Sequence, residues 1–152
     1  MKKLFFRGIV LLSAVVAFVA CEKVEPTAIT DDVVGSGTIQ GFVTYTPGSG
    51  QVRAANKPVF VDLDMTCFDA TFTGVKRYST TTDASGKFSL TVPCPVGKSA
   101  TGLLTVAFDE TYTQSSTNYL GHYEATDTFS VIDGGSYLHA FENLSPKYKL
   151  KQ

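Results

Sequence analysis

Segment 59–67 places an apolar side chain at every second position. The apolar residues are Val59, Val61, Leu63, Met65 and Cys67, and Asp62, Asp64 and Thr66 lie between them. Successive side chains of a strand point to opposite faces, so this period of two predicts a strand with one buried face. No helical stripe, with apolar residues three or four apart, persists from Gly37 onward. The chain is therefore expected to fold as β-structure.

Six further runs have the composition or alternation of strands, and turn residues separate them. The seven expected strands are 38–46, 59–67, 76–82, 87–94, 104–108, 123–132 and 136–144. Segments 47–56 and 113–121 are expected to be loops. Short strands with turn signals every 8–15 residues or so are typical of a β-sandwich. The predicted fold is an all-β, seven-stranded sandwich over residues 37–148.

The tetrapeptide Asp83-Ala84-Ser85-Gly86 lies between two of these strands. Aspartate at its first position and glycine at its last suit a type I turn followed by a left-handed residue, a common hairpin connection. We therefore expect strands 76–82 and 87–94 to form a hairpin. Pro93 and Pro95, on either side of Cys94, indicate that the second strand ends at an edge or a crossover.

The first 20 residues have the pattern of a secretory signal. Three basic residues among the first seven precede an almost wholly apolar segment, 8–20, which ends at Cys21. That segment is too short for a comfortable membrane span. Phe18-Val19-Ala20-Cys21 resembles the lipobox of bacterial lipoproteins, with Phe18 where leucine is commoner. The resemblance implies cleavage before Cys21 and lipidation of its sulfur and new amine. The alternative is an ordinary signal peptide with an incidental cysteine.

Processing at Cys21 divides the chain into four parts. These are a signal peptide (1–20), the lipidated cysteine with a tether (21–36), the sandwich (37–148) and a short tail (149–152). We expect a lipid-anchored protein of the cell envelope, at the outer membrane. Cleavage leaves ten basic residues against fourteen acidic ones, a net charge of −4 with histidine neutral. That charge argues against nucleic acid or an anionic lipid surface as partner, because both select basic patches.

Three stretches, taken in order, resemble carboxypeptidase regulatory-like domains. They are 37–43 (GTIQGFV), 58–63 (PVFVDL) and 81–90 (TTDASGKFSL). Such domains belong to the transthyretin-like (prealbumin-like) sandwiches of surface proteins. The resemblance implies a transthyretin-like, Ig-like sandwich in which the shared motif is structural. A tethered domain of this kind is similar to the small lipoproteins of Bacteroidetes.

Two cysteines, Cys67 and Cys94, remain once Cys21 carries lipid. The export compartment is oxidising, and both residues occupy the apolar phase of their expected strands. They form either one disulfide or two buried thiols, and the shared phase favours the disulfide. Their spacing has no zinc signature.

Few residues have the spacing that catalysis or metal binding requires. Asp62 and Asp64 lie about 7 Å apart on one strand face, but calcium needs six or more oxygens and no nearby loop supplies them. We interpret them as solvent-facing positions. His122 and His139 have no matched nucleophile, and the chain ends Tyr148-Lys149-Leu150-Lys151-Gln152. It therefore lacks the Tyr-Arg-Gly-Ser of the transthyretin-related hydroxyisourate hydrolases. We expect no enzyme activity, no cofactor and no metal.

Aromatic side chains are the remaining candidates for recognition. Exposed aromatic patches mark glycan or protein contacts, and Phe60, Phe68, Tyr119 and Tyr123 are the predicted binding residues. Phe72 and Tyr112 also fall in outward phases or loops. The alternative is that neighbouring loops cover these rings. The sequence favours a non-enzymatic structural or interaction module with an envelope protein or a glycan as partner. A glycan-binding accessory lipoprotein is the alternative, and a hydrolase is the least favoured class.

Overall fold

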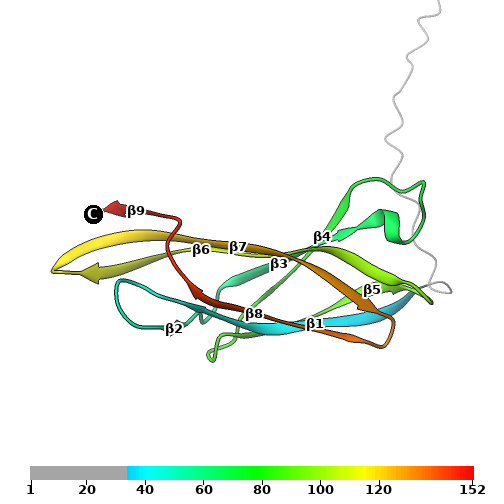
Figure 1. Ribbon diagram of the computed structural model, residues 1–152, viewed down its shortest axis with the longest axis horizontal. Helices are drawn as coiled ribbons and strands as arrows, with labels where there is room; N and C mark the ends of the chain where they lie inside the picture. Colours follow the sequence, from blue (N-terminus) through cyan, green and yellow to red (C-terminus); the bar gives the residue numbers. More distant parts are fainter. Residues whose placement is uncertain (1–33) are drawn as a thin grey trace, which may run out of the picture.

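The computed structural model describes residues 34–152 and consists of two β-sheets packed face to face (Figure 1). The predicted signal peptide, Cys21 and tether residues 22–33 lie outside the described residues. Within the described part, no helix is long and apolar enough to cross a membrane. The predicted all-β sandwich class is confirmed.

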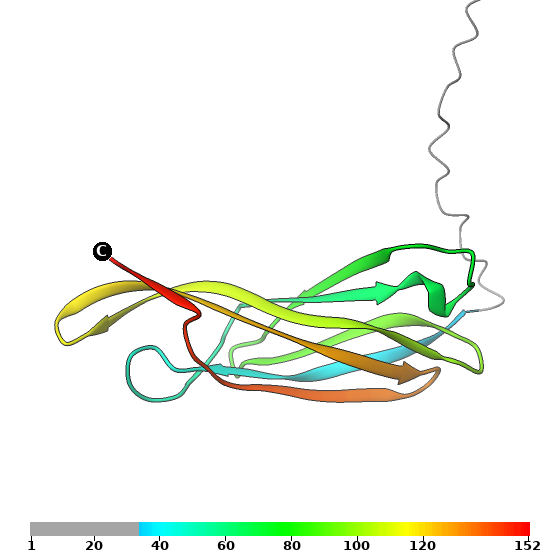
Figure 2. The ribbon, with the colours of Figure 1, turned by 45° about the horizontal axis from the view of Figure 1, so that its top comes forward.

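The first sheet, sheet A, is built around strand β1 (Val34–Tyr45). Strand β8 (Ser136–Leu144) pairs with β1 in parallel, and β5 (Lys87–Pro95) pairs with it antiparallel. The short strand β2 (Val52–Arg53) pairs with the end of β1 at Thr44 and Tyr45. Figure 2 shows β1 and β8 side by side along the lower layer.

The second sheet, sheet B, has the order β4-β3-β6-β7-β9, and all its neighbouring strands are antiparallel. The bounds are β3 (Pro58–Asp64), β4 (Val75–Thr81), β6 (Ser99–Gln114), β7 (Thr117–Ile132) and β9 (Tyr148–Lys151). Strands β6 and β7 form a long hairpin whose tip reaches past the rest of the sandwich (Figure 1).

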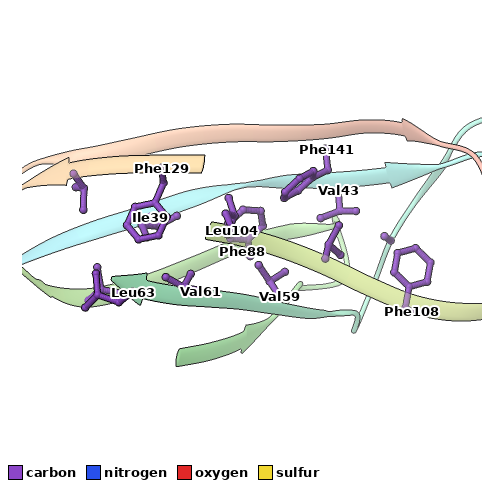
Figure 3. Packing of buried hydrophobic residues seen from close by; sticks show 14 of the residues in the cluster. Ile39, Val43, Val59, Val61, Leu63, Phe88, Leu104, Phe108, Phe129 and Phe141 are labelled. Carbon is purple, nitrogen blue, oxygen red and sulfur yellow. The ribbon is translucent and has the colours of Figure 1, made fainter. Parts of the chain in front are cut away.

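The apolar phases of the strands meet between the two sheets. Sheet A contributes Ile39, Val43, Phe88 and Phe141, and sheet B contributes Val59, Val61, Leu63, Leu104 and Phe129 (Figure 3). Full burial of such a side chain stabilises the fold by about 1.5–3 kcal/mol. The alternation that predicted the strand at Val59 therefore predicted its buried face correctly.

The predicted count of seven strands is wrong, because residues 34–152 form nine strands. Strand β2 lies in the expected loop 47–56, and the expected tail 149–152 contributes most of β9, which pairs with β7. The expected loop 113–121 is the end of the β6–β7 hairpin. Its turn is only Ser115 and Ser116, which adopt φ angles of 49° and 63°. Two-residue turns with positive φ angles usually contain glycine or asparagine, so the two serines did not indicate this turn in the sequence.

The predicted hairpin of strands 76–82 and 87–94 is also wrong, because β4 belongs to sheet B and β5 to sheet A. The turn itself is present: the Gly86 amide donates to the Asp83 carbonyl at 2.9 Å, and Gly86 has φ +76°. The chain changes sheets at Thr82, whose buried hydroxyl contacts the Ala54 carbonyl and accepts from the Lys57 amide at 2.8 Å. The local turn was therefore predictable, whereas the sheet change was not.

Candidate functional site

The outer face of sheet A carries a shallow hollow of about 550 Å³. Its lining includes outward-facing residues of three adjacent strands in two rows, and Gly41, Phe88 and Thr81 of β4 also border it. One row is Leu138, Gln40 and Ser89, and the next contains Phe42 and Lys87, by the register of β8, β1 and β5. Strands lie about 4.8 Å apart and rows about 7 Å apart. The sheet thus displays an aromatic ring, an amide, a hydroxyl and an ammonium group within one ligand-sized area.

The Asp83–Gly86 turn positions the β5 side of this hollow. One Asp83 carboxylate oxygen accepts hydrogen bonds from the backbone amides of Ser85 (2.8 Å) and Lys87 (2.9 Å) and from the Ser85 hydroxyl (2.7 Å). Bonds from Ser85 and Lys87 stabilise the charged form and lower the pKa of Asp83. This carboxylate therefore holds the start of β5 in place. It also lines the hollow, where it places a negative charge near Lys87.

Arg53 on β2 completes the site. Its guanidinium carbon lies 5.1 Å from the centroid of the Phe42 ring, within the range of a cation–π contact. Phe42 is half-buried, and Arg53 and Lys87 are both exposed. Two cationic side chains from different strands therefore flank the Phe42 ring.

A second hollow, of about 590 Å³, lies on the outer face of sheet B. Asp62, Asp64, Val75, Leu103 and Thr128 are among its lining residues. These two carboxylates are the pair that the sequence singled out, and both already accept hydrogen bonds from neighbouring residues. No cluster of three or more histidine, cysteine or acidic residues suited to a metal ion occurs within residues 34–152.

The carboxylates of the second hollow are held by neighbouring residues. Asp62 accepts hydrogen bonds from Nε and Nη2 of Arg77 at 2.7 and 2.6 Å, and these bonds lower its pKa. The same guanidinium lies 5.2 Å from the Phe60 ring centroid. Asp64 accepts from the amide and hydroxyl of Thr66 at 2.9 and 2.8 Å and so caps the 3-10 helix Met65–Cys67. A ligand here would have to compete with these bonds.

The four predicted binding aromatics do not come together. Phe60 lies on the outer face of β3 beside Arg77, and Phe68 follows the 3-10 helix and packs on the core. Tyr119 lies near the tip of the β6–β7 hairpin. Its ring stacks on Tyr112 with centroids 5.7 Å apart, and the Lys149 ammonium lies 5.1 Å from it. These positions provide no common patch.

Tyr123 is a core residue, so its interpretation as a binding residue is wrong. Its side chain is fully buried between the sheets and packs on Tyr45 and Phe108, with ring centroids 5.0 and 5.2 Å away. Its hydroxyl has no hydrogen-bond partner among the described residues. Burial raises the pKa of Tyr123 to about 12 because the charged phenolate would lose its water.

Cys67 and Cys94 are free thiols, so the expected disulfide is not formed. Strand β3 ends at Asp64, and Cys67 belongs to the 3-10 helix that follows, so it does not keep the strand phase from which the disulfide was predicted. Cys94 is fully buried in β5, with its sulfur 3.5 Å from the Val131 carbonyl oxygen. Burial raises the pKa of both thiols.

Each histidine contacts a carboxylate and an aromatic ring. His122 Nδ1 lies 2.6 Å from Asp109, and its ring stacks on Tyr148 at 4.8 Å. His139 Nδ1 lies 3.4 Å from Asp127, with the Phe141 ring at 4.5 Å. The two residues lie on different strands in different sheets. That neither is catalytic stays a prediction.

None of the residues of this site was predicted, and Phe42 and Gln40 are the clearest of those missed. The signal was present, since Ile39, Gly41 and Val43 alternate as the buried face of β1 and place residues 40 and 42 outside. An aromatic ring in the polar phase of a strand is a candidate surface contact. Arg53 carried no such signal, because it meets Phe42 only through the pairing of β2 with β1.

Comparisons with known proteins identify the fold. No family model and no curated protein matches the sequence significantly. Among solved structures, a "putative carbohydrate binding protein" from Pseudomonas aeruginosa superposes with a TM-score of 0.51 at 16% sequence identity. The match covers 74% of this chain and 89% of that chain. At this identity the likeness shows a shared fold.

Proposed function

We propose that this protein is a non-enzymatic, lipid-anchored binding module of the cell envelope and that its ligand is a carbohydrate. The observation that carries the proposal is the hollow on sheet A, where Phe42 lies beside Gln40, Lys87 and Ser89. The structural neighbour described as a "putative carbohydrate binding protein" supports this ligand class. The transthyretin-like, carboxypeptidase regulatory-like identity of the sandwich belongs to the same proposal, and the Asp83–Gly86 turn of its shared motif supports it.

The chemistry of the hollow suits a sugar ring. A pyranose has apolar C–H edges, which pack on an aromatic ring, and hydroxyl groups, which need donors and acceptors around them. Phe42 supplies the apolar contact. The Gln40 amide donates and accepts, the Ser89 hydroxyl does both, and the Lys87 ammonium donates. A small number of polar groups beside an apolar surface is typical of sites that bind small ligands.

Binding to a panel of purified polysaccharides tests the ligand class. We expect Phe42→Ala to weaken binding about tenfold, since loss of an aromatic contact of about 1–1.5 kcal/mol corresponds to that factor. Phe60→Ala is the matched control, because Phe60 is a half-buried ring on the outer face of the other sheet. If no polysaccharide binds, or if both variants weaken binding equally, the proposed site is wrong.

Lipid anchoring has its own test at Cys21. A protein with two or more acyl chains is held on a membrane almost irreversibly, because each buried CH₂ contributes about 0.8 kcal/mol. Cys21→Ala should therefore abolish lipid incorporation, which mass spectrometry measures, and leave the protein unprocessed or in the soluble fraction. A Cys21→Ala protein of wild-type mass that still fractionates with membranes would contradict the lipoprotein assignment. Cys67→Ala, which retains the lipobox, is the control.

A further inference from the structure

We infer that the carbohydrate bound at the sheet A hollow is acidic, with ring carboxylates held by Arg53 and Lys87. This inference rests on the proposed function and names its ligand class. Lys87 is the Cα partner of Phe42 on β5, and Arg53 reaches the same ring from β2. A sugar that packs on Phe42 would therefore place its substituents between two cations.

Neither of these two cations forms an ion pair within 4.0 Å with a carboxylate among residues 34–152, although the Lys87 charge helps to lower the pKa of Asp83. By contrast, Lys57 pairs with Glu110, Arg77 with Asp62 at 2.6 Å, and Lys147 with Glu124 at 2.6 Å. The guanidinium of Arg53 keeps its donors available, since a cation–π contact uses the face of the group and not its N–H bonds. Its planar fork matches a carboxylate with two parallel hydrogen bonds.

The acidic groups near the hollow do not cancel this charge. Asp83 lines the hollow and its lowered pKa keeps it ionised, but it supplies one negative charge against the two positive charges of Arg53 and Lys87. Glu142 lies further along β8 than Ala140, the partner of Phe42, and does not line the hollow. The second hollow differs because it contains Asp62 and Asp64. Only the sheet A hollow, of these two, therefore complements an anion.

The experiment compares uronate polymers with their uncharged counterparts. The purified protein is titrated with polygalacturonate, alginate and hyaluronate, and with the carboxyl-reduced form of each, in low salt. We expect binding to at least one acidic polymer to be about tenfold tighter than to its reduced form. We also expect 0.5 M NaCl to remove most of this preference, because exposed ion pairs are screened by salt.

The double variant Arg53→Gln/Lys87→Gln isolates the two cations. It should lose the preference for the acidic polymer over its carboxyl-reduced form. Binding of the reduced form should fall less than binding of the acidic polymer, because Phe42, Gln40 and Ser89 remain even though the Lys87 donor to sugar hydroxyls is lost. The control variant Lys76→Gln/Lys98→Gln removes the same charge at positions away from the hollow and should keep the preference.

The outcomes separate this inference from the proposed function. Equal binding to acidic and reduced polymers would overturn the inference and leave carbohydrate binding intact. Tighter binding to dextran sulfate than to every uronate polymer would overturn the assignment to carboxylates. Failure to bind any polysaccharide, neutral or acidic, would overturn the proposed function itself. Loss of the preference in the control variant would show general charge attraction and would also overturn the inference.

Discussion

Replacing Tyr123 by alanine should lower the free energy of unfolding by about 3–5 kcal/mol, the range measured when a large buried aromatic is truncated. The side chain is fully buried, and its ring packs on Tyr45 and Phe108. Its removal would leave a cavity between the two sheets that the long β6 and β7 strands cannot close without breaking their pairing. Urea unfolding followed by circular dichroism measures the change.

Tyr123→Phe is the informative companion, because it removes only the hydroxyl. That hydroxyl is buried without a partner within residues 34–152, so its burial costs free energy that phenylalanine avoids. We expect Tyr123→Phe to keep the stability or raise it by about 1 kcal/mol. A loss of stability comparable to that of Tyr123→Ala would show that the hydroxyl makes a necessary hydrogen bond. Tyr119→Ala, at the half-buried ring near the hairpin tip, should cost less than Tyr123→Ala.

Replacing Gly41 by alanine should destabilise the fold by about 3 kcal/mol, the upper part of the usual range for overpacking. A Cβ atom at Gly41 would stand 1.7 Å from the carbonyl oxygen of His139 and 2.9 Å from the Phe88 ring. His139 is the Cα partner of Gly41 on β8, so its carbonyl cannot move away without disturbing the parallel β1–β8 pairing. Thermal and urea unfolding measure the loss.

Gly50→Ala is a control that introduces backbone strain without a steric clash. Gly50 has φ +83°, which disfavours alanine, but nothing lies within 4 Å of the added Cβ. We expect this variant to lose only about 1 kcal/mol. If Gly41→Ala lowers the free energy of unfolding by no more than Gly50→Ala does, then the His139 carbonyl of β8 does not lie as close to Gly41 as the structure places it.

The two hollows differ in what binding would require of them. On sheet B, the Asp62 carboxylate and the Arg77 guanidinium already satisfy each other with two hydrogen bonds. A ligand must replace those bonds, and breaking a satisfied pair costs free energy before any contact is gained. On sheet A, Arg53 and Lys87 form no hydrogen-bonded ion pair among the described residues, so a ligand there need not break one. This difference is the physical reason for proposing the sheet A hollow as the carbohydrate site.

The sequence by itself determined which segments form most of the strands and which side of several strands is buried. Alternation at Val59, Val61 and Leu63 depends on the strand period alone, and the same rule places Phe42 outside. The turn at Asp83–Gly86 was equally local, because an aspartate side chain and a left-handed glycine suffice to form it. Such features need no knowledge of distant parts of the chain.

Only the tertiary structure decided which strands share a sheet and which side chains meet. Strands β4 and β5 are joined by a hairpin-type turn and yet belong to different sheets, because Thr82 bonds to the segment between β2 and β3. Tyr123 is buried because its ring packs on Tyr45 of the other sheet, which is distant in the sequence. Arg53 and Phe42 likewise meet only because β2 returns to pair with β1. Such contacts depend on strand pairing over long sequence separations, which local periodicity does not encode.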